Sequence, residues 1–150
     1  MNRLKGKIAL ITGAARGMGE SHARGFVAEG AKVIMTDVNT KLGAAVAADI
    51  GPDALFIEHD VASLEDWRRV LAQGEAKFGT VNVLVNNAGI LGPLGIKAAE
   101  LLEADYLKVC AVNQHSVFLG MHVVIPSMLR AGKGSIVNRS EERRVGKECA

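Results

Sequence analysis

Residues 8–19 read IALITGAARGMG, an apolar strand that runs directly into a turn carrying Gly13, Gly17 and Gly19. A helical pattern follows the turn. This order places free backbone N–H groups, and the positive end of the helix dipole, where a phosphate can bind. Glycine suits such a turn because a Cβ would block its backbone angles or the approach of the ligand. The stretch predicts a phosphate-binding turn, and the alternative is a glycine turn with a structural role only.

The spacing of these glycines is G-x-x-x-G-x-G. It differs from the G-x-G-x-x-G dinucleotide fingerprint, and it lacks the Gly-Lys-Ser/Thr ending of the nucleotide triphosphatase loop. The glycine turn alone therefore does not indicate which ligand binds, and residues elsewhere in the chain must supply that information.

Length and composition favour one globular α/β domain: 150 residues, of which 49% are hydrophobic and 23% charged. A net charge of +2 predicts no nucleic-acid partner. The two cysteines, Cys110 and Cys149, have no metal-ligand spacing, and the four histidines show none either, so we predict no metal site and a reducing cytoplasm. No run approaches the roughly 20 apolar residues of a membrane span, so we also expect no membrane partner.

Strands alternate with helices along the chain. We expect strands over 8–11, 32–36, 54–58, 81–85 and from 135, and helices after residue 17, after Asn39 or Thr40, after Ser63, and over about 98–130. Ser63 and Asp66 have capping-box spacing. The pattern predicts βαβ units, hence a doubly wound parallel sheet in a three-layer α/β/α, Rossmann-type fold.

The last residues differ in character from the rest. Residues 139–149, RSEERRVGKEC, hold seven charged residues in eleven, so the strand that begins at Ser135 has no apolar continuation. A parallel strand inside such a sheet should be almost entirely apolar. We therefore predict a C-terminally truncated domain over 1–138 and a non-native tail over 139–150.

Asp37 ends the second strand, 18 residues after Gly19. A carboxylate there can accept hydrogen bonds from ribose hydroxyls and would repel a 2′-phosphate, which favours NAD over NADP. Arg16 is the counter-argument, because a guanidinium could pair with that phosphate.

Asp60 holds the matching place after the third strand, where it could bond the adenine amino group or merely cap its own loop. The turn Asn86-Asn87-Ala88-Gly89 closes the fourth strand. Because the carboxyl ends of parallel strands share one edge, these groups form one candidate ligand site with the glycine turn.

Asn113 stands in the middle of an otherwise apolar helical line that includes Leu102, Tyr106, Ser116 and Gly120. One interpretation is a buried asparagine that bonds to a neighbouring backbone, at a bend in the helix. The other is an asparagine that holds a water or a catalytic side chain.

Taken in order and spacing, these motifs resemble the short-chain dehydrogenase/reductase family: T-G-x-x-x-G-x-G at 12–19, Asp37, Asp60-Val61, N-N-A-G at 86–89 and Asn113. SVFLGMHVVIPSM and GSIVN look most like the branch that acts on hydroxysteroids and cyclic secondary alcohols. The resemblance implies cofactor contacts from Gly13, Arg16, Gly17, Met18, Gly19, Asp37, Asp60, Val61, Asn87, Ala88 and Gly89. It implies that Asn113 belongs to a catalytic Asn-Ser-Tyr-Lys set, and that the intact protein is a homotetramer.

The chain departs from the family pattern where I-V-N-x-S-S should continue, because Ser140 takes the first serine position and Glu141 replaces the second. The Tyr-x-x-x-Lys pair of the family is absent, and Tyr106, the only tyrosine, has no Lys four residues on. Residues 139–149 resemble a translated sequencing adapter; a frameshifted allele or a real charged tail is the alternative.

The sequence therefore predicts an NAD-dependent oxidoreductase that moves hydride between nicotinamide and a secondary alcohol or ketone, with this chain an inactive fragment. A non-catalytic nucleotide-binding module and a sugar-nucleotide epimerase are the other interpretations.

Overall fold

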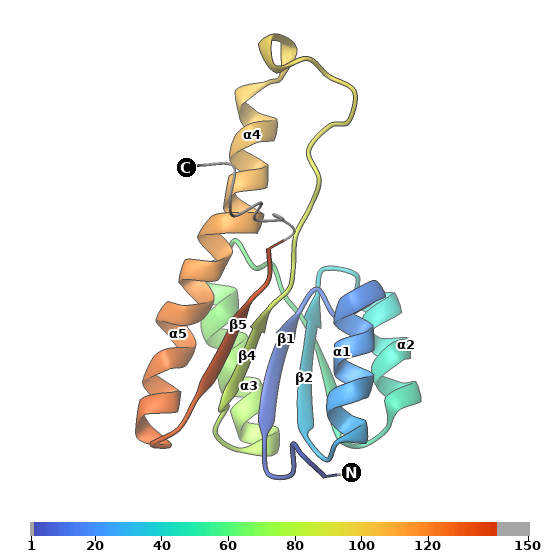
Figure 1. Ribbon diagram of the computed structural model, residues 1–150, viewed down its shortest axis with the longest axis vertical. Coiled ribbons are helices and arrows are strands. Elements are labelled where there is room, and N and C mark those ends of the chain that lie inside the picture. Colours follow the sequence, from blue (N-terminus) through green and yellow to red (C-terminus); the bar gives the residue numbers. More distant parts are fainter. Residues whose placement is uncertain (1, 141–150) are drawn as a thin grey trace, which may run out of the picture.

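The computed structural model describes residues 2–140, and its centre is a parallel five-stranded sheet in the order β3-β2-β1-β4-β5 (Figure 1). Leu10 in the middle strand pairs with Ile34 on one side and Leu84 on the other. The strands are β1 (Ile8–Thr12), β2 (Lys32–Asp37), β3 (Ala54–Glu58), β4 (Val83–Asn86) and β5 (Ser135–Asn138).

Helices cover the two faces of the sheet and complete the predicted three layers, with α1 and α2 on one face and α3 and α5 on the other (Figure 1). The helices are α1 (Gly17–Ala28), α2 (Thr40–Ile50), α3 (Leu64–Phe78), α4 (Glu103–Cys110) and α5 (Ser116–Arg130), with a 3₁₀ turn η1 (Ala98–Glu100) and a π-helical turn η2 (Ala111–His115). The Rossmann-type, doubly wound prediction is confirmed.

Alternate residues of the buried strands pack into two separate hydrophobic cores, one on each face of the sheet. Ile11 belongs to the cluster under α1 and α2, whereas its neighbour Leu10 belongs to the cluster under α3 and α5. This follows from the two-residue repeat of a strand, which points successive side chains to opposite faces. Trp67 of α3 is the largest fully buried side chain.

Side-chain caps fix where two of the helices begin. The side-chain oxygen Oδ1 of Asn39 accepts the Leu42 N–H at 3.1 Å, which resolves the choice between Asn39 and Thr40. Ser63 Oγ accepts the Asp66 N–H at 3.2 Å. The predicted capping box is only half formed, because the Asp66 carboxylate accepts the N–H of Asp60 instead of that of Ser63.

The prediction of one long helix over 98–130 is wrong at its start. Leu101 and Leu102 are extended, with ψ of 129° and 138°, so the continuous helix begins only at Glu103. The expected buried line fails there too, because Leu102 and Tyr106 are 67% and 57% exposed. Helix α4 projects beyond the sheet (Figure 1), so no layer formed by residues 2–140 covers this half of the line.

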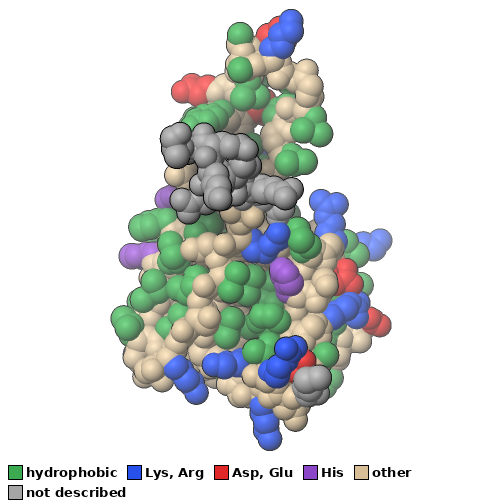
Figure 2. Space-filling model, viewed as in Figure 1, with side chains coloured by type: hydrophobic (Ala, Val, Ile, Leu, Met, Phe, Trp, Pro, Cys, Tyr) green, Lys and Arg blue, Asp and Glu red, His purple; other side chains and the backbone are tan. Residues whose placement is uncertain are grey.

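The layer formed by α1 and α2 does not extend over β4 and β5. Figure 1 draws no helix in front of these two strands, and Figure 2 shows hydrophobic side chains gathered across the same face. Val137 of β5 is 46% exposed. Within residues 2–140, the sheet is therefore covered on both faces only at its β1–β3 side.

One helical run among residues 2–140, Glu103–Arg130, is long and apolar enough by length and composition alone to cross a membrane, with a mean hydropathy of 1.2. The expectation that the sequence holds no such stretch was based on uninterrupted apolar runs, and this helix is interrupted by polar residues. The α5 part of this run packs against β4 and α3 with Leu119 and Val124 buried, which is the packing of a core helix.

Candidate cofactor site

The candidate site lies at the carboxyl edge of the sheet, between the neighbouring strands β1 and β4. The connections that follow these two strands lead to opposite sides of the sheet. The chain order runs β1, β2, β3 outward on one side and β4, β5 on the other. Such a reversal leaves a crevice outside the carboxyl ends of the strands, and open α/β sheets bind their ligands there. The site residues named from the sequence, apart from Asn113, lie at or just after the ends of β1, β2, β3 and β4 at this edge.

The turn between β1 and α1 has the geometry expected of a phosphate-binding loop. Gly13 and Gly17 have φ of 64° and 59°, which favours glycine at both positions. Helix α1 begins at Gly17, and its N-cap residue, Arg16, makes no side-chain capping bond. The N–H groups of the first turn, at Gly17, Met18 and Gly19, therefore face the edge of the sheet without a capping side chain.

Two of the three glycines are required by packing, and the third leaves open space. A Cβ on Gly19 would lie 2.1 Å from the Gly13 carbonyl oxygen, and one on Gly13 would lie 2.9 Å from Ala88 Cα. A Cβ on Gly17 would meet nothing within 4 Å. Gly13 and Gly19 thus let α1 and the β4 turn close on each other, while Gly17 leaves room on the outer side of the turn.

Thr12 joins the turn after β1 to the turn after β4. Its Oγ1 accepts the N–H groups of Asn87 and Ala88, each at 3.0 Å. In return the Asn87 amide donates to the carbonyl oxygens of Thr12 at 2.9 Å and Gly13 at 3.2 Å. This role of Thr12 was not predicted from the sequence, although a hydroxyl at a strand end beside a glycine turn was a usable signal.

Asp37 ends β2 and is bonded to the same turn. Its carboxylate accepts the Ala15 N–H at 3.2 Å and the Asn39 N–H at 2.9 Å, one on each oxygen. A carboxylate offers about four lone-pair positions, so two acceptor positions are left for ribose hydroxyls. Arg16 is exposed, and its side chain has no hydrogen bond or ion pair with residues 2–140.

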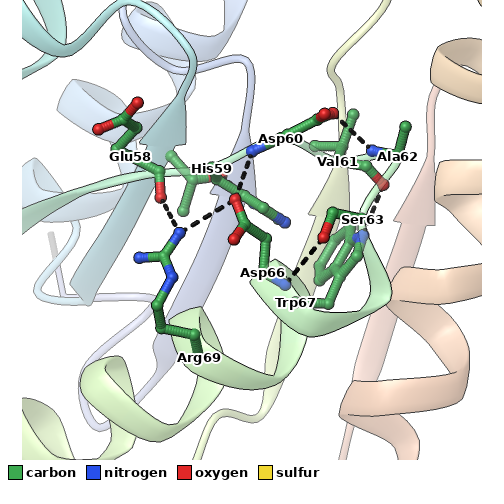
Figure 3. Close-up of polar contacts among 10 residues, drawn as sticks. Glu58, His59, Asp60, Val61, Ala62, Ser63, Asp66, Trp67 and Arg69 are labelled. Carbon is green, nitrogen blue, oxygen red and sulfur yellow. Dashed lines mark hydrogen bonds and ion pairs between the residues drawn. The ribbon is translucent and has the colours of Figure 1, made fainter.

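The loop after β3 is closed by its own side chains (Figure 3). Asp60 Oδ1 accepts the Ala62 N–H at 2.9 Å, and the Asp60 N–H donates to Asp66 Oδ2 at 2.9 Å. That N–H, together with the Arg69 guanidinium at 3.0 Å, lowers the pKa of the Asp66 carboxyl despite its partial burial. The loop-capping interpretation of Asp60 is confirmed, and its second oxygen remains unbonded within the described chain.

His59 is a buried histidine at the base of this loop, 1% exposed. Its Nδ1 lies 3.0 Å from Thr36 Oγ1, and its ring meets the Trp67 ring edge to face at 4.5 Å. Burial lowers the pKa of His59 to about 4; the Asp66 and Asp60 carboxylates oppose this shift and Arg69 adds to it. His59 is therefore a packing histidine of the core.

Asn113 lies in the π-helical turn and bonds to the segment that follows β4. Its Oδ1 accepts the Ile90 N–H at 2.8 Å, and its Nδ2 donates to the Ile90 carbonyl oxygen at 2.9 Å. It also lies beside Gly89, 3.6 Å from the position of a Cβ there. The expected backbone partner is confirmed, but Asn113 is exposed, so the expected burial is wrong.

The structure separates Tyr106 from the candidate site. Tyr106 lies on the projecting helix α4, where a hydrogen bond with the Cys110 thiol raises its pKa. Glu141 and the rest of the predicted tail, 141–150, lie outside the described residues. Arg139 is described, and its guanidinium donates to Asn87 Oδ1 at 3.1 Å.

The described surface is hollowed at two other places. A groove of about 330 Å³ lies between α3 and α5, and one of about 400 Å³ lies between α5 and β5. Neither is lined by a residue of the glycine turn. Among residues 2–140, no group of three or more His, Cys, Asp or Glu side chains could hold a metal ion.

Several known proteins resemble this chain. It is 44% identical over 142 residues to 2,5-dichloro-2,5-cyclohexadiene-1,4-diol dehydrogenase LinX of Sphingobium indicum, covering 93% of this chain and 56% of that protein. It is 43% identical over 137 residues to the 3-beta-hydroxysteroid dehydrogenase of Comamonas testosteroni, covering 91% and 53%. The chain therefore spans about half the length of the relatives it matches.

Among solved structures, the 3-ketoacyl-(acyl-carrier-protein) reductase of Brucella melitensis complexed with NADH matches with a TM-score of 0.83 and 36% identity. The match covers 86% of this chain and 53% of that one. A family model described as short chain dehydrogenase matches residues 7–142. The chain belongs to the short-chain dehydrogenase family.

Proposed function

We propose that the protein represented by this chain is an NAD-dependent oxidoreductase that moves hydride between nicotinamide and a secondary alcohol or ketone. The observation that carries the proposal is the joint built by Thr12, which holds the glycine turn against Asn87 and Ala88 at the strand-order reversal. The relatives named as a cyclohexadiene-diol dehydrogenase and a hydroxysteroid dehydrogenase support cyclic alcohols as the substrate class.

The residues at this edge fit a dinucleotide. The uncapped start of α1 and the open space at Gly17 suit a pyrophosphate, and the unused lone pairs of Asp37 suit the adenosine ribose. The negative charge of Asp37 disfavours a 2′-phosphate, so we propose NAD and rank NADP below it. When bound, the nicotinamide ring would supply or accept the hydride.

The residues of this chain have separate roles in that proposal. The Asp60 carboxylate and the Val61 N–H would bind the adenine, and the turn through Asn87, Ala88 and Gly89 would bind the nicotinamide-side ribose. By the family resemblance, Asn113 would fix a water in the proton relay, and its two bonds to Ile90 place it next to Gly89. The homotetramer implied by the family resemblance and the cytoplasmic location inferred from the two cysteines belong to the same proposal.

We further propose that the 150-residue chain binds NAD but does not turn over. The family's Tyr-x-x-x-Lys pair would supply the acid and the lysine that lowers its pKa, and the only tyrosine of this chain lies on α4. A non-catalytic nucleotide-binding module is the second candidate, and it makes the same binding prediction.

The first test measures thermal unfolding with NAD, NADP and ADP-ribose at millimolar concentration. A ligand that binds only the native state raises the unfolding temperature by mass action. We expect a rise with NAD and ADP-ribose that the Asp37→Ala variant loses. Flat curves for the wild-type chain would refute binding by this chain.

The second test separates the two candidates. The source DNA is amplified across codon 138, and the longer frame is assayed for NADH formation with 3-hydroxysteroids and cyclic diols. Turnover by the longer product supports the dehydrogenase. A confirmed stop codon after residue 150 leaves only the binding module.

A further inference from the structure

We propose that Trp67 is a positioning residue for the adenine side of the cofactor site, acting through the peptide group between Val61 and Ala62. This inference rests on the proposed function, because it assumes that the loop after β3 receives an adenine. The indole Nε1–H donates to the Val61 carbonyl oxygen at 2.8 Å (Figure 3). Trp67 itself is fully buried and cannot touch the ligand.

The peptide group between Val61 and Ala62 is held at both of its ends. Its carbonyl oxygen accepts from Trp67, and its N–H, that of Ala62, donates to Asp60 Oδ1 at 2.9 Å. Turning this peptide would therefore turn the Asp60 carboxylate as well. The indole thus fixes the direction of a carboxylate on the exposed side of the loop without contacting it.

The preceding peptide group leaves a donor beside that carboxylate. The Asp60 carbonyl oxygen accepts the Ser63 N–H at 3.0 Å, and the Val61 N–H on the same peptide has no partner among residues 2–140. The loop therefore offers an acceptor, Asp60 Oδ2, and a donor, the Val61 N–H. Adenine presents the opposite pair along one edge, an amino donor beside a ring-nitrogen acceptor. Hypoxanthine presents the reverse pair, an oxo acceptor beside a ring N–H.

The indole is itself held in one orientation by neighbours from other elements. The His59 ring stands perpendicular to it, at 89°, and His59 is bonded to Thr36 of β2. On its far side the ring reaches α5, where a Cβ on Gly120 would lie 2.7 Å from Trp67 Cη2. The Nε1–H consequently has little freedom to leave the Val61 carbonyl, which a side chain used only for packing would not require.

The test compares the affinity of the 150-residue chain for NAD and for nicotinamide hypoxanthine dinucleotide by titration calorimetry. We expect the wild type to bind NAD more tightly. Trp67→Phe removes the donor and keeps an aromatic ring, and we expect NAD to bind about three- to tenfold more weakly, as for one lost neutral hydrogen bond. The ratio between the two dinucleotides should fall towards one.

Val70→Ala is the matched control, because Val70 is a fully buried neighbour on α3 that makes no side-chain hydrogen bond to the loop. It should lower stability and keep the wild-type ratio. Should Trp67→Phe fail to fold, benzothienylalanine at position 67 keeps the shape of the indole and replaces its N–H by sulfur. The same loss of selectivity is expected from it.

The outcomes are distinct. If the wild type binds neither NAD nor ADP-ribose, the proposed binding of NAD by this chain fails and this inference fails with it. If the wild type binds both dinucleotides equally, or if a folded position-67 variant keeps the wild-type ratio as Val70→Ala does, the inference is overturned and the proposed function stands.

Discussion

Thr12 Oγ1 accepts two consecutive backbone N–H groups, those of Asn87 and Ala88, each at 3.0 Å. These two residues come directly after β4, and one hydroxyl therefore accepts the N–H groups that have no acceptor in the sheet. Thr12 is 1% exposed, so water cannot take over this role. Both of these backbone N–H groups therefore depend on a single oxygen atom.

We expect Thr12→Val to lower the free energy of unfolding by about 2 kcal/mol or more, because two N–H groups lose their acceptor in a dry environment. Thr12→Ser keeps the oxygen and should cost about 1 kcal/mol or less. Urea unfolding followed by Trp67 emission measures both. Equal midpoints for the two variants would contradict the joint.

Gly17 and Gly19 should respond differently to alanine. In Gly19→Ala the new Cβ meets a backbone oxygen at 2.1 Å, so α1 must shift, and we expect a loss of several kcal/mol, of the size of severe overpacking. In Gly17→Ala only the positive φ is strained, at about 1–2 kcal/mol. Chemical denaturation measures the unfolding free energy of both variants. A Gly17→Ala variant that is less stable than Gly19→Ala would contradict the prediction.

His59 should make the unfolding free energy depend on pH between about 6.5 and 4. The folded state keeps His59 neutral down to about pH 4, whereas an unfolded chain protonates a histidine near 6.5. The unfolded state binds more protons in this window, so stability is complete above it and falls as the pH drops through it. The expected loss is about 3 kcal/mol.

The measurement compares wild type with His59→Gln at pH 7, 5.5 and 4.5. Glutamine can still bond Thr36 and does not titrate, so the difference between the two proteins removes the contribution of the carboxylates. We expect the difference in unfolding free energy, wild type minus His59→Gln, to decrease as the pH falls. A constant difference at all three values would refute the buried neutral histidine.

Gly120→Ala should destabilise the fold, whereas Gly25→Ala should stabilise it. A Cβ at position 120 would meet Trp67 Cη2 and Asn86 Oδ1, both at 2.7 Å, and overpacking costs about 1–3 kcal/mol. A Cβ at position 25 meets nothing within 4 Å on a regular helix, and alanine there gains about 0.5–1 kcal/mol. Thermal unfolding of the two variants should shift in opposite directions.

Asn113→Leu should free the segment that follows β4. Leucine can neither accept the Ile90 N–H nor donate to the Ile90 carbonyl oxygen, so both bonds are lost. We expect faster amide exchange at Ile90 with little change at β1. Unchanged protection at Ile90 would show that the segment is held by other contacts.

Much of this fold could be read from apolar runs and glycines. The strand at Ala54–Glu58 has its predicted bounds because the run is short, apolar and ended by turn residues. β4 begins two residues later than predicted, because the Val81 N–H bonds to the Glu75 carboxylate and does not enter the sheet. Periodicity cannot detect a partner 6 residues away on another element.

The site was predictable by residue type but not by its connections. Gly13, Asp37, Asn87 and Ala88 do converge, since parallel strands share one carboxyl edge. Thr12 and Trp67 were missed because their roles are hydrogen bonds to backbone atoms that lie far from them in the sequence or past a turn. Asn113 was placed on the buried line because that line assumes 3.6 residues per turn throughout.

The π-helical turn Ala111–His115 explains that last error and has a consequence for length changes in the chain. The turn contains one residue more than an α-helical path needs. Deleting Gln114 would restore regular winding and keep Ser116, Gly120 and Val124 against the sheet. The part of the helix before the deletion would rotate by about 100° about its axis. A loss of one codon would therefore leave the folded core intact and turn Asn113, which bonds both backbone groups of Ile90, away from that residue.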